Sequence, residues 1–351
     1  MKPHVFFFFI FALEISYYFA QKKDTTRLLE PDLVYYNKGC QLIDSTDYKE
    51  AIKLFHKALK INSQFTQAIN KIAYCKYKLG DGEGAEKELQ KSLELDPDNL
   101  TTIKYYGFIL FEDKKFRQAK ACLDSARKLS TLDHELDFLL GCINLSEKNL
   151  KTALANFNSA IEIKNNYADA FLKRGFTYFE MKNYKNCLAD LGRYQSLNPN
   201  DTLNTLLFST KGNANYNLQN FAASISDYSQ LLKINPKNDT AYLNRGAAKI
   251  ETGDFSGAID DETNATKIRS NSYAAFNLRG VAKASLKSYA AAIEDFDKAI
   301  KLKFDFHPAY VNRASVRYAM KDKKKACDDL YKADQLGSNT AFKIIEQYCK
   351  D

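Results

Sequence analysis

The chain has 351 residues, of which 45% are hydrophobic and 27% are charged, and its formal net charge is +8. This composition is typical of a folded protein with an apolar core and excludes an intrinsically disordered chain. Lysine and arginine are spread along the chain rather than gathered in a stripe, so we expect no nucleic-acid partner.

The N-terminus carries the pattern of an export signal. Lys2 precedes an apolar run over residues 5–13, which is too short to span a membrane and matches the apolar core of a secretory signal peptide. We expect residues 1–20 to be a signal peptide cleaved after Ala20, and residues 21–31 to be a leader. The alternatives are an uncleaved N-terminal membrane anchor and a buried helix. No later stretch is long and apolar enough to cross a bilayer, so the sequence predicts export to the periplasm or cell envelope.

The remaining chain repeats every 34 residues, counted from Asp32. Five repeats fill residues 32–201, three additional residues follow at 202–204, and four repeats fill residues 205–340. Position 20 is always small, and position 24 is large and apolar or aromatic in every repeat except the seventh, which has Glu262. Position 8 is always glycine or alanine: Gly39, Ala73, Gly107, Gly141, Gly175, Gly212, Gly246, Gly280 and Ala314.

This spacing predicts two amphipathic helices in each repeat. Positions 4, 8 and 12 fall on one face of a first helix, and positions 20, 24 and 27 fall on one face of a second. Small residues at positions 8 and 20 let the two backbones approach, and the large residue at position 24 fills the remaining space. Pro97, Pro199 and Pro236 all occupy position 32, where a helix must end.

The pattern resembles the tetratricopeptide repeat, whose signature is glycine at position 8, an aromatic residue near 17, alanine at 20 and 27, and proline at 32. The resemblance implies an all-α fold: a right-handed superhelical solenoid of about nine helix-turn-helix repeats. Residues 341–351 are expected to form a capping helix that turns Phe342, Ile345 and Cys349 toward the ninth repeat. The repeats, rich in lysine, asparagine, tyrosine and phenylalanine, also resemble exported repeat proteins of Bacteroidetes-type bacteria.

In that family the first helices line a concave groove, and positions 2, 5, 9 and 12 face the ligand. Position 12 is apolar in every repeat, which favours packing against the next first helix, and positions 5 and 9 could be either core or ligand-facing. Carried onto this chain, the resemblance implies partner-binding residues at Tyr36, Tyr74, Phe108, Phe138, Phe176, Asn213, Asn277, Ser315 and Tyr318.

Two further features allow alternative interpretations. Position 7 carries Arg174, Arg245, Arg279 and Arg313, which could form a basic ladder for acidic partners or could lie along neighbouring helices with their charges in water. The insertion at 202–204 could change the stacking angle, act as a hinge, or simply lengthen a loop.

The sequence contains no arrangement that predicts catalysis, a metal site or a bound cofactor. None of the seven cysteines has metal-ligand spacing. In an exported chain, Cys327 of the last repeat and Cys349 of the cap could form a disulfide.

These features predict a binding protein rather than an enzyme: an exported scaffold that holds a protein or an extended peptide in its groove. The alternatives are a structural subunit of a cell-envelope or secretion assembly, and an accessory to glycan or peptidoglycan metabolism. Fold alone does not choose among them.

Overall fold

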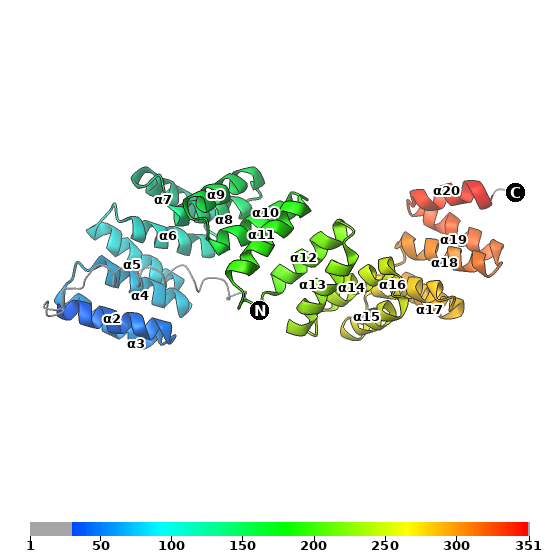
Figure 1. Cartoon of the computed structure of the whole chain (residues 1–351), viewed down its shortest axis with the longest axis horizontal. Helices are drawn as coiled ribbons and strands as arrows, with labels where there is room; N and C mark the ends of the chain where they lie inside the picture. Colours follow the sequence, from blue (N-terminus) through cyan, green and yellow to red (C-terminus); the bar gives the residue numbers. More distant parts are fainter. Residues whose placement is uncertain (1–29, 350–351) are drawn as a thin grey trace. The chain divides into compact units, whose positions relative to one another are not determined.

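The computed structural model describes residues 30–349, and this part of the chain contains nineteen α-helices and no strand (Figure 1). The predicted signal peptide at 1–20 and most of the leader lie outside the described residues. The chain divides into two compact units, residues 1–132 and residues 133–351. The all-α fold of stacked helix pairs is confirmed.

The first unit contains three helix pairs. They are α2 (Pro31–Asp44) with α3 (Tyr48–Ile61), α4 (Thr66–Lys78) with α5 (Gly82–Leu95), and α6 (Leu100–Glu112) with α7 (Phe116–Leu129).

The second unit contains six helix pairs and a final single helix, α20 (Asn339–Tyr348). The pairs are α8 (His134–Ser146) with α9 (Leu150–Ile163), α10 (Ala168–Glu180) with α11 (Tyr184–Leu197), α12 (Thr205–Asn217) with α13 (Phe221–Ile234), α14 (Asp239–Thr252) with α15 (Phe255–Ile268), α16 (Tyr273–Ser285) with α17 (Tyr289–Leu302), and α18 (His307–Ala319) with α19 (Lys323–Gln335).

The turn between the two helices of each pair has a left-handed residue at position 15. Only Gly80 and Gly253 are glycines there; the other seven repeats place a side-chain-bearing residue at φ between 58° and 65°. Five of the seven are lysines: Lys114, Lys148, Lys182, Lys287 and Lys321. A non-glycine residue in this region costs roughly 1 kcal/mol, so the packing of the paired helices sets the turn geometry rather than the turn's own preference.

The core of each pair depends on the contact between positions 8 and 24. A Cβ added to Gly39 would lie 2.6 Å from the ring of Phe55, and one added to Gly107 would lie 2.4 Å from Leu123. Both distances are shorter than van der Waals contact. The glycines are therefore required by close helix approach, which also explains why they are tolerated inside helices.

The seventh repeat departs from this pattern at Glu262, which occupies position 24 on α15 and has no exposed surface. Both of its carboxyl oxygens lack a hydrogen-bond partner among the described residues. Burial, helped by the charge of Asp261 and opposed by that of Arg279, raises the pKa of Glu262 to about 9. The carboxyl group is therefore held neutral in a core site built for an apolar side chain.

The guanidinium groups of the position 7 arginines are neither free to bind acidic partners nor held out in water. Each makes two hydrogen bonds to the buried aspartate sixteen residues later, at position 23. Arg279 Nε and Nη2 donate to the two carboxylate oxygens of Asp295 at 2.9 and 2.6 Å. The same paired geometry joins Arg174 with Asp190, Arg245 with Asp261, and Arg313 with Asp329.

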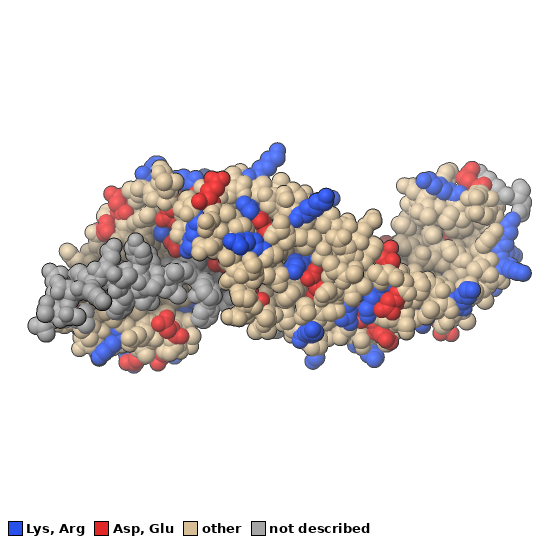
Figure 2. All heavy atoms as spheres, viewed as in Figure 1, with Lys and Arg blue, Asp and Glu red and all other residues tan. Residues whose placement is uncertain are grey.

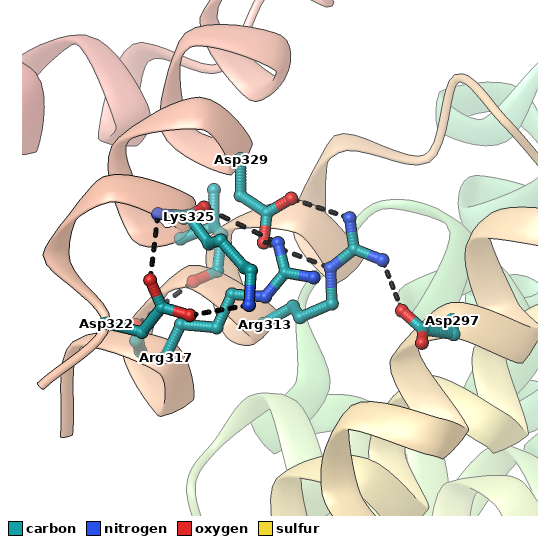
Figure 3. Close-up of polar contacts among 8 residues, drawn as sticks. Asp297, Arg313, Arg317, Asp322, Lys325 and Asp329 are labelled. Atoms are coloured by element: carbon teal, nitrogen blue, oxygen red, sulfur yellow. Dashed lines mark hydrogen bonds and ion pairs between the residues drawn. The ribbon is translucent and has the colours of Figure 1, made fainter. Parts of the chain in front are cut away.

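The third guanidinium donor of these arginines reaches the preceding repeat. Arg245 Nη1 donates to Ser229 Oγ at 2.9 Å, and Arg279 Nη1 donates to Thr263 Oγ1 at 3.2 Å. Figure 3 shows the last member of the series, in which Arg313 joins Asp329 of its own repeat to Asp297 of the eighth. Each arginine therefore fastens three helices together, which a lysine cannot do with the same planar fork.

In the sixth repeat, position 7 holds a lysine instead of an arginine, and its contact with the buried aspartate is weaker. Lys211 lies 3.4 Å from Asp227, whose second oxygen accepts from Asn215 Nδ2 at 2.8 Å. Burial raises the pKa of Asp227 despite the lysine. The single ammonium group of Lys211 therefore stabilises the buried carboxylate less than the two-donor arginine contact does in the repeats that carry an arginine.

The insertion at 202–204 is an ordered part of the second unit. The Asn204 side chain is buried and caps α12 by accepting from the amide of Leu207 at 3.0 Å. The hydroxyl of Tyr194 donates to Asp201 just before the insertion. The boundary between the two units lies elsewhere, between Leu132 and Asp133.

Helix α20 packs on α19 through Ala341 and Ile345, which are both buried. The expectation for Phe342 is wrong: its side chain is 55% exposed, because α20 begins at Asn339 and turns Ala341 rather than Phe342 toward the ninth repeat.

Glu262→Leu is expected to raise the free energy of unfolding at neutral pH by about 1–3 kcal/mol, because it removes an unsatisfied buried carboxyl group. The unfolded chain releases this proton near pH 4.5, whereas the folded protein holds it to about pH 9. Wild-type stability relative to the variant should therefore fall as pH rises through this window, by at most ~1.4 kcal/mol per pH unit. Urea denaturation of both proteins at several pH values measures the difference. Parallel stability curves would contradict the assignment.

Arg279→Met is expected to lower the free energy of unfolding by about 3 kcal/mol, because it leaves the buried Asp295 with Lys283 as its remaining cation. Lys148→Met is the matched control. Lys148 pairs with Glu180, and both side chains are largely exposed, so its loss should change stability by less than ~1 kcal/mol. Equal effects of the two substitutions would show that burial of the pair does not matter.

Candidate functional site

The first helices of the repeats form the inner face of each unit. In the first unit α2 contacts α4, and α4 contacts α6. In the second unit the same holds along the series α8, α10, α12, α14, α16 and α18. No pair of successive second helices has comparable contacts. Because helices on the concave side of a curved stack lie closer together, the first helices present the concave surface.

Two of the predicted aromatic residues, Tyr36 and Tyr74, are half-buried on this face of the first unit. The ring of Tyr36 lies 5.0 Å from that of Phe65. The ring of Tyr74 lies 6.3 Å from that of Tyr48, and Lys78 Nζ lies 5.4 Å from its centre. Burial raises the pKa of Tyr74. Each ring is thus fixed by neighbouring rings while part of its surface stays accessible.

Three of the predicted partner-binding residues are buried and offer no surface to a partner. Phe108 is packed at 5.6 Å against the ring of Tyr77, and Phe138 lies between Phe157 and Tyr167 with ring centres 6.0 and 5.1 Å away. Asn277 is also buried. At these positions the structure has the core alternative: a neighbouring first helix covers Phe108, whereas Phe157 of the second helix and Tyr167 cover Phe138.

The remaining predicted residues of the second unit differ in their availability. Phe176 is half-buried and Ser315 is exposed. Asn213 is half-buried, and its amide oxygen accepts from Tyr228 Oη at 2.7 Å and Asn244 Nδ2 at 3.4 Å. In the same way, the amide oxygen of Asn277 accepts from Asn312 Nδ2 at 3.0 Å. The polar residues of this face therefore serve first to join successive first helices.

A pocket of about 240 Å³ lies where α18, α19 and α20 meet. It is lined by Ala314, Ser315, Tyr318, Ala326, Cys327, Leu330, Ile344, Tyr348 and Cys349. In this structure Cys327 and Cys349 are joined by a disulfide with their Cα atoms 5.8 Å apart.

Sequence reasoning reached Ser315, Tyr318 and the two cysteines of this pocket but missed Ile344 and Tyr348. It also missed the aspartates of position 23, although the recurrence of arginine and aspartate sixteen residues apart was available as a signal.

On the face shown in Figure 2, basic and acidic side chains are interspersed rather than gathered by sign. Within residues 30–349 no group of three or more histidine, cysteine, aspartate or glutamate side chains could hold a metal ion. In the same part of the chain no helix has the length and hydropathy needed to cross a membrane.

Known proteins are similar to this chain over parts of its length. Rat sperm-associated antigen 1 is 36% identical over 63 residues, which cover 18% of this chain and 7% of that protein. The outer membrane protein assembly factor BamD of Rickettsia prowazekii is 27% identical over 172 residues, covering 40% of this chain and 68% of BamD. The chain thus spans less than a tenth of the length of sperm-associated antigen 1.

Two solved structures have the same fold. PilF of Pseudomonas aeruginosa superposes with a TM-score of 0.55 at 18% identity, over 63% of this chain and 97% of its own. YrrB, described as a TPR protein with an unusual peptide-binding site, gives a TM-score of 0.50 at 21% identity, over 53% of this chain and 95% of its own.

Family models agree with the repeat pattern. Models of the tetratricopeptide repeat match residues 42–101, 169–201 and 273–306, and a model of the TPR repeat matches residues 143–182 and 212–253. These segments together cover more than half of the chain, and the matches fall on helix pairs in both units. The chain therefore belongs to the tetratricopeptide repeat family.

Proposed function

We propose that this protein is an exported scaffold that binds a protein or an extended peptide on the inner face of its repeats. The observation that carries the proposal is the position of partly accessible aromatic side chains on the first helices. Tyr36, Tyr74 and Phe176 all lie on that face and keep part of their surface exposed. Aromatic side chains anchor partners well because they bury much area while losing little conformational freedom.

The ion pairs of the second unit favour a binding surface on the inner face that carries little charge. The arginines of position 7 are satisfied by buried aspartates, so they are not available to select an acidic partner. Recognition would instead depend on aromatic contact and on shape. Export rests on the apolar run at residues 5–13 and on the expected cleavage after Ala20.

A structural role in a cell-envelope assembly is the second candidate. The similarity to BamD favours it, because BamD is an outer membrane protein assembly factor. In that case the contacts with other subunits would involve the second helices or the ends of the stack, rather than the inner face.

Capture of partners by tagged protein from the native cell envelope, followed by mass spectrometry, tests the proposal. Tyr74→Ala probes the first unit and Phe176→Ala probes the second; Phe108 is avoided because its truncation would open a core cavity. At least one of the two variants is expected to bind the captured partner about 10–30-fold more weakly, as expected for loss of an anchoring side chain.

The matched controls are Leu129→Ala and Ile268→Ala, which remove exposed apolar side chains from second helices. They should bind like the wild type. A set of subunits retained by both inner-face variants but lost in the controls would favour the structural role, and would overturn binding on the inner face.

A further inference from the structure

The pocket at the end of the stack exists because α20 is short. The first helices of the nine repeats have 13 or 14 residues, whereas α20 has 10 and ends at Tyr348. Helix α18 contacts its predecessor α16, but it has no comparable contact with α20, which packs on α19. The last turn of α18, with Ser315 and Tyr318, therefore lacks the neighbouring first helix that covers the equivalent turn of α14 and α16.

The walls of the pocket are uncharged. Its floor is formed by Ala314, Ala326 and Leu330, which are all buried. Tyr318 and Tyr348 flank it as an edge-to-face pair with ring centres 5.5 Å apart. Their side chains are 51% and 41% exposed. Among residues 30–349 no cation or carboxylate lines the pocket, so these lining residues do not favour a phosphate or a charged headgroup.

The volume of the pocket and the two tyrosine rings beside it indicate which class of ligand it can bind. A volume of about 240 Å³ is below the roughly 300–1,000 Å³ of pockets that enclose drug-sized molecules. It suits a single large side chain. Rings at the edge of such a pocket add offset or edge-to-face contacts with an entering aromatic group, beyond what area burial alone supplies.

The hydroxyl group of Ser315, beside the pocket, is already used within the chain. Ser315 Oγ donates to the carbonyl oxygen of Val311 at 3.0 Å. An apolar ligand atom placed against Ser315 would therefore leave no unsatisfied hydroxyl donor, which further favours an apolar occupant over a polar one.

We propose that this pocket binds one aromatic side chain of the partner. The assignment rests on the proposed function, because it supposes that the partner follows the inner face to the end of α18. Cys327 and Cys349 both line the pocket, so their disulfide fixes the position of the α20 wall relative to α19.

The probe for this site is N-acetyl-L-phenylalaninamide, added to the full chain with labelled isoleucine methyl groups. The probe should shift the NMR signal of Ile344, which lines the pocket, and N-acetylglycinamide should not. Ser315→Trp should weaken binding of the probe at least tenfold, because an indole placed at this exposed position fills the pocket.

Ser285→Trp is the matched control, since Ser285 is also an exposed helical serine whose hydroxyl donates to the carbonyl four residues earlier. It should leave binding of the probe unchanged. An Ile344 signal that does not move, or that moves equally in Ser315→Trp, overturns the site.

Partner capture separates this inference from the proposed function. If Ser315→Trp captures the partner as well as wild type while Tyr74→Ala or Phe176→Ala does not, the pocket is not used by the partner although the inner face is. A partner lost in Ser315→Trp and retained in Ser285→Trp supports the assignment.

Reduction of the disulfide provides a second, independent experiment. Dithiothreitol reduces the bond between Cys327 and Cys349 to two thiols and is itself oxidised to a cyclic disulfide. Alkylation and mass spectrometry report the bond, and the NMR titration is repeated on the reduced protein. We expect binding of the probe to weaken at least fivefold, because α20 is then no longer held covalently against α19. Unchanged binding in fully reduced protein would overturn the role of the disulfide in forming the pocket.

Discussion

The close contact between position 8 of a first helix and position 24 of its second helix is the constraint on which the stack depends. Because glycine at position 8 brings the backbones together, the large residue at position 24 fills the interface without a cavity, as Phe55 does opposite Gly39. The same contact explains why lysines in the turns adopt a left-handed backbone conformation. The core fixes the positions of the two helices, and the turn takes the backbone conformation that joins them. Glu262 reveals how strongly the site is apolar, since the carboxyl group there must remain protonated to be accommodated.

A second, polar constraint joins one repeat to the next. The arginines of position 7 use a rigid fork to satisfy an aspartate of their own repeat and a hydroxyl, amide or carboxylate of the preceding one. These buried groups favour one stacking geometry, because a shifted helix would leave a charged aspartate without its partner. These arginines occur only in the second unit. In the first unit the equivalent positions hold Lys38, Ile72 and Tyr106, and other polar contacts join successive repeats, such as the buried hydrogen bonds between Asn70 and Thr102.

The sequence predicted the helices well because their signal is periodic. The first helices from α4 onward begin at the residues where the 34-residue count restarts, such as Thr66 and Leu100, and proline marks three of the junctions between repeats. The period does not specify which groove positions are covered. Phe108 and Asn277, at positions 9 and 5, are buried, and they contact a neighbouring first helix of the same unit through Tyr77 and Asn312. The arginine and aspartate pairs were also missed, although the sixteen-residue spacing recurs.

Binding surfaces in a stacked protein arise where stacking is incomplete. Along the series, each first helix covers side chains of its neighbour, so residues that a family pattern assigns to a ligand can become core. At α18 this cover is less complete: α20 reaches Tyr318 through the ring of Tyr348, its last residue. Helix α20 has two effects on the end of the second unit. It shields Leu330 and the neighbouring core from water, and it forms one wall of the aromatic-lined pocket beside α18.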